Sequence, residues 1–92
     1  MSEQGALIES KKTAVFLRVE ATGNAQEHRE VYSVNPPLSG HDTVCVTAHK
    51  SQRVVYVQGW DGGPGTYVHA PIRGFTEPAA ALKQVGYVIV VS

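Results

Sequence analysis

The chain has 92 residues, a length that fits one domain and leaves no room for two. Eight basic residues balance eight acidic ones, so the sequence lacks the basic stripe that gives nucleic-acid-binding proteins most of their affinity. Nucleic-acid binding is therefore disfavoured. No apolar run reaches the ~18 residues that a membrane-spanning helix needs, so no membrane association is predicted.

Cys45 is the only cysteine and lies within a valine-rich segment. A lone thiol cannot form an intrachain disulfide, and its apolar setting favours a core position in a protein of the reducing cytoplasm. The lysines near the N-terminus follow the apolar residues instead of preceding them, which is the reverse of a secretory signal. A cytoplasmic location is therefore predicted.

Residues 1–12 are polar and mixed, and we expect a flexible N-terminal arm followed by a single α+β domain over residues 13–92. Leu7 and Ile8 form a small apolar knot in the arm. The arm either frays or docks on a neighbouring subunit through these two residues, which makes them candidate interface residues.

The first predicted strand covers residues 13–21, where apolar side chains alternate with a period of two. The alternation predicts that Val15, Leu17 and Val19 face the core. It leaves Phe16 on the opposite face as a candidate interface aromatic. After a Gly-Asn turn, residues 28–34 are predicted to return as a second strand that ends at Pro36, because proline cannot donate to a sheet ladder.

The central hairpin is predicted from residues 43–49 and 54–57, joined by a polar loop of three to five residues. The second of these strands is apolar on both faces, which is typical of a central strand that is covered on both sides. Val55 on this strand is therefore a further candidate interface residue.

Four of the nine glycines lie in the segment Gly59–Gly65, GWDGGPG. This segment is the best candidate for a ligand site, since loops carry function more often than other segments. Trp60 would supply an aromatic face for stacking, and Asp61 would supply a hydrogen-bond acceptor. The nearby His69 and Arg73 would complete the ligand pocket. The structural alternative is a hairpin connection with Trp60 folded back onto the sheet.

A short helix is predicted over residues 77–85, with Thr76 as N-cap, Pro78 in the first turn and Gly86 as the C-terminal cap. Residues 87–91, YVIVV, form a final strand with no polar face.

His41, Cys45 and His49 are spaced by four, which would align metal ligands on a helix. On a strand, residues four apart are separated by ~13 Å, too far to share one ion. No metal site and no cofactor are predicted, and a mid-strand cysteine is a poor nucleophile.

These elements predict an α+β fold: a mainly antiparallel sheet of five or six strands with one short C-terminal helix on one face, in the order β-β-β-β-(β)-α-β. The alternative is a small curled β-barrel with the helix as a plug. One short helix cannot cover both faces of the sheet, so a homodimer is predicted if the sheet does not close.

The sequence carries no catalytic motif, and the favoured function is a non-catalytic binding or interaction protein that acts as a homo-oligomer and can have a protein partner. Two alternatives stay open. One is a small-molecule-binding protein or simple enzyme with its pocket at Gly59–Gly65, and the other is a nucleic-acid binder.

Overall fold

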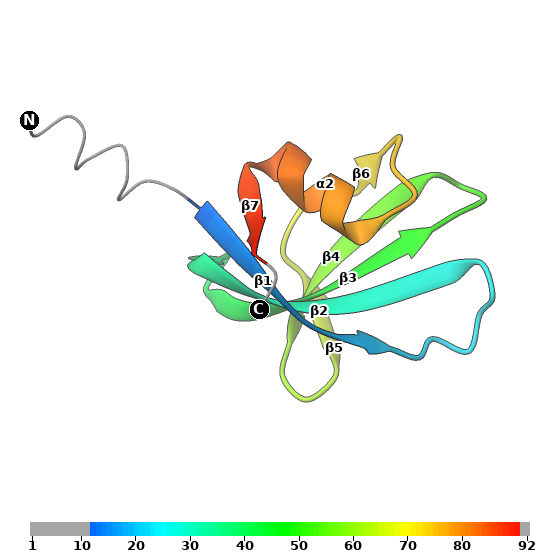
Figure 1. Cartoon of the computed structure of the whole chain (residues 1–92). Coiled ribbons are helices and arrows are strands. Elements are labelled where there is room, and N and C mark those ends of the chain that lie inside the picture. Colours follow the sequence, from blue (N-terminus) through cyan, green and yellow to red (C-terminus); the bar gives the residue numbers. More distant parts are fainter. Residues whose placement is uncertain (1–11, 91–92) are drawn as a thin grey trace, which may run out of the picture.

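The structure of the protein is a computed structural model that describes residues 12–90. Seven strands and one helix lie in this range (Figure 1). In chain order they are β1 Lys12–Glu20, β2 Glu27–Leu38, β3 His41–His49, β4 Val54–Trp60, β5 Pro64–Tyr67, β6 Ile72–Arg73, α2 Pro78–Val85 and β7 Tyr87–Val90.

The strands form one open sheet in the order β5-β4-β3-β2-β1-β7, and β6 pairs with β4 beside β5. All neighbours are antiparallel except β1 and β7, which are parallel. The predicted α+β fold with a mainly antiparallel sheet and a C-terminal helix is confirmed. The sheet has two edges and does not close, so the barrel alternative is excluded.

The second strand is longer than predicted, because β2 continues through Pro36 and Pro37 to Leu38. The register between β2 and β3 shifts after Ser33, and pairing resumes at Leu38 and His41. A two-residue turn joins these strands, and both Ser39 and Gly40 have positive φ, at 50° and 83°. Positive φ at both central positions is the requirement of the type I′ turn, whose twist fits a hairpin.

The helix α2 begins one residue later than predicted. Its N-cap is Glu77 and not Thr76, and the side chain of Glu77 makes no capping hydrogen bond. At the other end Gly86 adopts φ 110°, so the predicted left-handed cap is confirmed. Within residues 12–90, no helix has the length and apolar character needed to cross a membrane.

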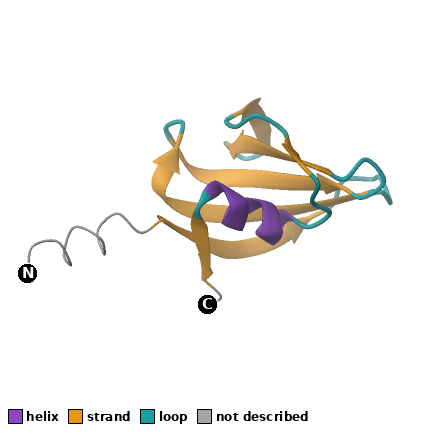
Figure 2. Cartoon of the chain, turned by 90° about the horizontal axis from the view of Figure 1, so that it is seen from above, coloured by secondary structure: helices purple, strands orange, loops and turns teal. Residues whose placement is uncertain are grey.

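The helix lies across one face of the sheet, as the view from above shows (Figure 2). Its buried residues Pro78, Ala81 and Leu82 are spaced three and four apart, which places them on one side of the helix. They pack against those strand residues, at alternate positions, whose side chains point toward the helix. The core members on the strands are Ala14, Tyr32, Val34, Val44, Val46, Ala48, Val55, Val57, Ile72 and Tyr87.

The structure reverses the facing predicted for β1. Ala14 is fully buried and Phe16 packs against the core, with its ring edge-on to Tyr32 at a centroid distance of 5.7 Å. Leu17 and Val19 are instead 44% and 56% exposed. A β-bulge between Phe16 and Arg18 breaks the alternation, so the period-two pattern cannot hold along the whole strand.

Gly59 is expected to be sensitive to substitution because it makes room for a ring. A Cβ at this position would lie 2.6 Å from two atoms of the His41 imidazole. Gly59→Ala should therefore lower the free energy of unfolding by about 1–3 kcal/mol through overpacking, as measured by urea titration. Gly63→Ala is the matched control, since an added Cβ there meets nothing within 4 Å. Equal stability of both variants would contradict this account.

Candidate functional site

The structure does not bring the predicted ligand residues together. Trp60 is the last residue of β4, whereas Arg73 on β6 pairs with Val54, the first residue of that strand. Six residues of extended chain separate these positions by ~20 Å. Asp61 and His69 are exposed, and the imidazole of His69 hydrogen-bonds the carbonyl of Ala70 at 2.7 Å.

The Gly59–Gly65 segment is mostly part of the sheet. Gly59 and Trp60 belong to β4, and Pro64 and Gly65 belong to β5, so only residues 61–63 connect the two strands. The Trp60 ring is half-buried, and the guanidinium carbon of Arg18 lies 5.3 Å from its centroid. This arrangement agrees with the structural alternative, in which Trp60 folds back onto the sheet.

Of the four candidate interface residues, Leu7 and Ile8 lie outside the described residues. Val55 is fully buried and belongs to the core beneath α2, and Phe16 packs against the same core. In a single chain these two side chains are thus already engaged with the helix-covered face.

A different surface lies on the side of the sheet away from α2. Residues that pair across neighbouring strands point to the same face, and two such rows cross the sheet. The first row contains Arg18, Val31, Cys45 and Gln58, and the second contains Glu20, Arg29, Thr47 and Tyr56. They alternate with the core positions on the same strands, so they face away from the helix. We call this surface, together with Trp60 and Tyr67, the open face.

The open face is partly covered by its own long side chains. Val31 and Cys45 are fully buried although no described helix covers this side. Arg18 on β1 reaches Trp60 on β4, and β2 and β3 lie between these strands in the sheet order. The stacked pair therefore spans the apolar middle of the first row and keeps water from it.

Beside this pair lies a shallow cavity of about 320 Å³. Tyr56 and Tyr67 contribute two tilted rings with centroids 5.9 Å apart, and Tyr67 is 66% exposed. The Nε of Arg29 donates to Thr47 Oγ1 at 3.0 Å, which fixes the guanidinium against the sheet. The cavity is lined by Glu27, Arg29, Thr47, His49, Gln52, Tyr56, Gln58 and Tyr67.

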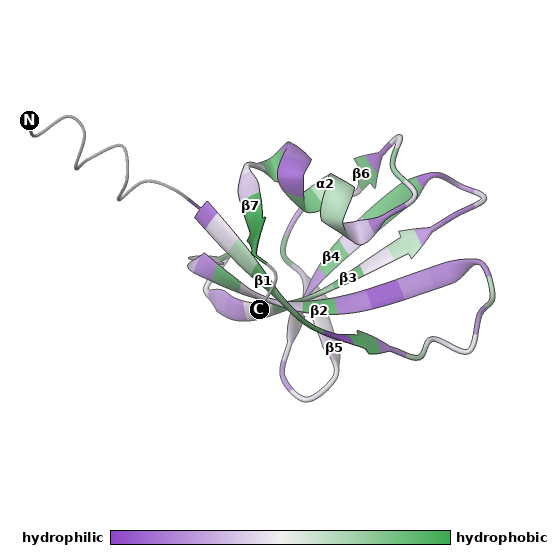
Figure 3. Ribbon diagram, viewed as in Figure 1, coloured by the Kyte–Doolittle hydropathy of each residue, from purple (hydrophilic) through white to green (hydrophobic). Residues whose placement is uncertain are grey.

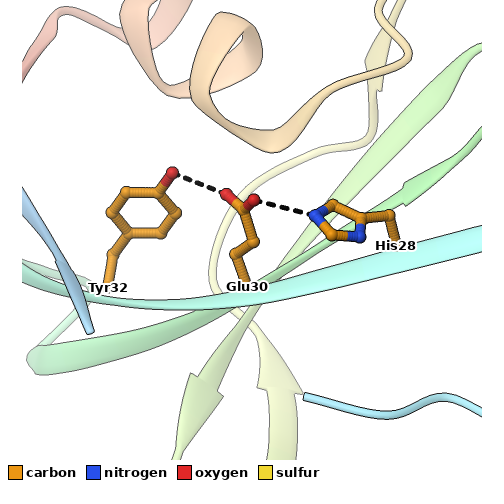
Figure 4. Close-up of polar contacts among 3 residues, drawn as sticks. All are labelled: His28, Glu30 and Tyr32. Atoms are coloured by element: carbon orange, nitrogen blue, oxygen red, sulfur yellow. Dashed lines mark hydrogen bonds and ion pairs between the residues drawn. The ribbon is translucent and has the colours of Figure 1, made fainter. Parts of the chain in front are cut away.

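A second cavity, of about 260 Å³, lies on the helix side between β2 and the start of α2. One carboxylate of its lining, that of Glu30, is held between two side chains (Figure 4). The Tyr32 hydroxyl donates to Glu30 Oε1 at 2.7 Å, and His28 Nε2 lies 2.8 Å from Glu30 Oε2. Lys50 and the exposed Glu77 also line this cavity, so its walls carry both signs of charge.

This polar network serves structure more than acid-base chemistry. Burial raises the pKa of the Tyr32 hydroxyl well above its usual range, and the hydrogen bond to the anionic Glu30 and its charge raise that pKa further. The phenol therefore stays protonated at neutral pH and acts as a hydrogen-bond donor. Both oxygens of a carboxylate that borders the core are thereby satisfied.

The buried thiol is likewise unsuited to nucleophilic attack. Cys45 is fully buried, and this burial raises the pKa of its thiol, although the Thr47 hydroxyl and the Arg29 charge partly offset the effect. A reactive cysteine needs a lowered pKa and solvent access. Among residues 12–90, no three His, Cys, Asp or Glu side chains are grouped so that they could hold a metal ion.

Sequence reasoning missed the open face because its residues come from five strands. Arg29 and Thr47 are 18 positions apart, and only the register of β2 and β3 brings them together. The available signal was the polar and aromatic content of alternate strand positions, such as Tyr56 and Gln58. Comparison with protein-family models, with curated proteins and with solved structures gave no match.

Proposed function

We propose that this chain is a non-catalytic interaction protein that binds a protein partner through the open face. The observation that carries the proposal is the gathering of Trp60, Tyr56, Tyr67, Arg18 and Arg29 on the side of the sheet that α2 leaves uncovered. Tryptophan, tyrosine and arginine are the residues most enriched at the energetic centres of protein interfaces.

The geometry of these side chains favours binding. They stand on strands of one sheet, and Arg29 is held by Thr47 and Arg18 by its contact with Trp60. Groups that are ordered before binding lose less conformational entropy when a partner arrives. The bond to Thr47 uses one of the five N–H donors of Arg29, and the others can serve carboxylate or carbonyl oxygens of the partner.

The charges of the open face support a protein partner over a nucleic acid. Glu20 pairs with Arg18 in a salt bridge, and Glu27 lines the same cavity as Arg29. Nucleic-acid surfaces instead need basic side chains free to neutralise several phosphates. The free, buried thiol of Cys45 supports a location in the reducing cytoplasm.

The test compares two variants as baits. Tyr67→Ala combined with Arg29→Ala truncates the open face, and Lys83→Ala changes an exposed residue of α2 as the matched control. Proteins retained from a lysate of the native cells in stoichiometric amount are identified and purified, and their dissociation constants are measured by calorimetry. The double variant should bind at least about tenfold more weakly than the control, while its circular dichroism is unchanged. Equal affinity of both variants would refute the proposal.

A further inference from the structure

The two edges of the sheet differ in how they are protected. One edge is formed by β5 and the two-residue β6, and β5 contains Pro64 and Gly65. Short strands and prolines are the usual devices that keep an edge from pairing with another chain. This edge is therefore poorly suited to accept a further strand.

The opposite edge, β7, is as short as β5 but lacks its proline and glycine. Its four residues Tyr87–Val90 contain no proline and no charge, and they pair with β1 without a register shift. Val88 and Val90 are 46% and 38% exposed. The hydropathy colouring shows β7 as largely hydrophobic (Figure 3). An exposed, regular and apolar edge is a template for one more strand.

Exposed apolar side chains also concentrate near this edge. Five large hydrophobic residues are exposed in the described part of the chain, and four of them lie on β1 and β7. Val88 and Val90 lie on the β7 edge itself, whereas Leu17 and Val19 lie on β1 beyond Val15, the last residue that pairs with β7. The partner of this edge must therefore supply both a backbone ladder and apolar side chains.

We propose that the partner at this edge is a second copy of the chain, with the two β7 strands antiparallel about a twofold axis at Ile89. Two identical strands satisfy both demands at once, and the twofold contact leaves open only the outer edges formed by β5 and β6, where Pro64 lies. Because the strand is uncharged, the pairing places no like charges opposite each other. The proposal does not depend on the open face as a binding surface.

The facing of the side chains selects the register. Val88 and Val90 lie beside Thr13 and Val15, on the side away from α2, whereas Ile89 packs toward the helix-side core. With Ile89 opposite its own copy, Val88 faces the second copy's Val90 on the same side. The two sheets then join into one continuous sheet, and both helices lie on the same face.

The first test is the mass in solution, measured by light scattering on the full chain at micromolar concentration. Wild type should show about twice the 9.9 kDa chain mass. Val88→Lys combined with Val90→Lys should show the mass of one chain with an unchanged circular dichroism spectrum. Tyr67→Lys places a charge at the protected edge and should remain a dimer.

The second test fixes the register by disulfide trapping in a Cys45→Ala background. Proteins carrying Val88→Cys or Val90→Cys should form a cross-linked dimer when mixed, and much less when each is oxidised alone, because position 88 faces position 90 across the axis. A wild-type mass of one chain overturns the proposal. So does a dimer that the two lysines leave intact, since its contact must lie elsewhere.

Discussion

Replacing Leu82 by alanine is expected to remove a large share of the stability of this fold. Leu82 is fully buried and is the largest of the buried side chains that α2 contributes to the core. Truncating such a leucine costs about 2–5 kcal/mol, because the lost transfer free energy adds to the cost of the cavity left behind. The whole free energy of unfolding of a folded domain is only about 5–15 kcal/mol.

The measurement is urea unfolding followed by circular dichroism, with Lys83→Ala as the matched control. Lys83 is the next residue on the same helix and is exposed, so its truncation should change the free energy of unfolding by no more than about 0.5 kcal/mol. If the two variants unfold at the same urea concentration, α2 does not anchor the core as the structure indicates.

The second large effect is expected in alkali. Burial raises the pKa of three groups, the hydroxyls of Tyr32 and Tyr87 and the thiol of Cys45. The ordinary pKa values are about 8.5 for cysteine and 10 for tyrosine. Below these values each group is protonated in both the folded and the unfolded chain, so its contribution to the stability of the folded state is fully present. As the pH rises further, the unfolded chain loses these protons first, and the folded state is progressively disfavoured.

Each group can lower the free energy of unfolding by up to about 1.4 kcal/mol per pH unit while it is ionised only in the unfolded chain. Between pH 10 and 11.5 the free energy of unfolding should therefore fall progressively, measured by urea titration at a series of pH values. Tyr32→Phe removes one of the three groups, so stability should fall less steeply with pH in this variant. A stability that stays constant up to pH 11 would contradict the burial of these groups.

Local features of the fold could be predicted because local chemistry determines them. Glycine is the residue type that best tolerates the left-handed conformation, so Gly86 could be predicted as the helix cap. The alternation of apolar and polar side chains in residues 43–49 is regular enough to define β3. The facing of β1 could not be predicted in the same way. Ala14 and Phe16 are apolar, as are Val15 and Leu17, so the pattern alone does not select a face. The pairing with β2 selects it, because Ala14 and Phe16 lie opposite the core residues Val34 and Tyr32.

The candidate site depended on contacts that no local pattern contains. Proximity in sequence suggested that Trp60 and Arg73 share a pocket, but the chain follows β4 from end to end between them. Arg18 and Trp60 are 42 positions apart in the sequence, and the order of strands in the sheet brings their side chains together. Both the separation of Trp60 from Arg73 and the contact between Arg18 and Trp60 could be predicted only from the pairing of strands that are distant in the sequence.

The parallel pairing of β1 with β7 has a consequence for how the chain folds. The amine of Lys12 donates to the carbonyl of Val85 at 3.1 Å, and it lies 4.4 Å from the ring centroid of Tyr87. Both contacts join residues that are at least 73 positions apart in the sequence. During synthesis, the edge of β1 that faces away from β2 can pair only after β7 has emerged from the ribosome. Contacts between such distant positions slow folding, since the loop between them must close before they form. We therefore expect the hairpins of β1 to β4 to form before β7 joins the sheet.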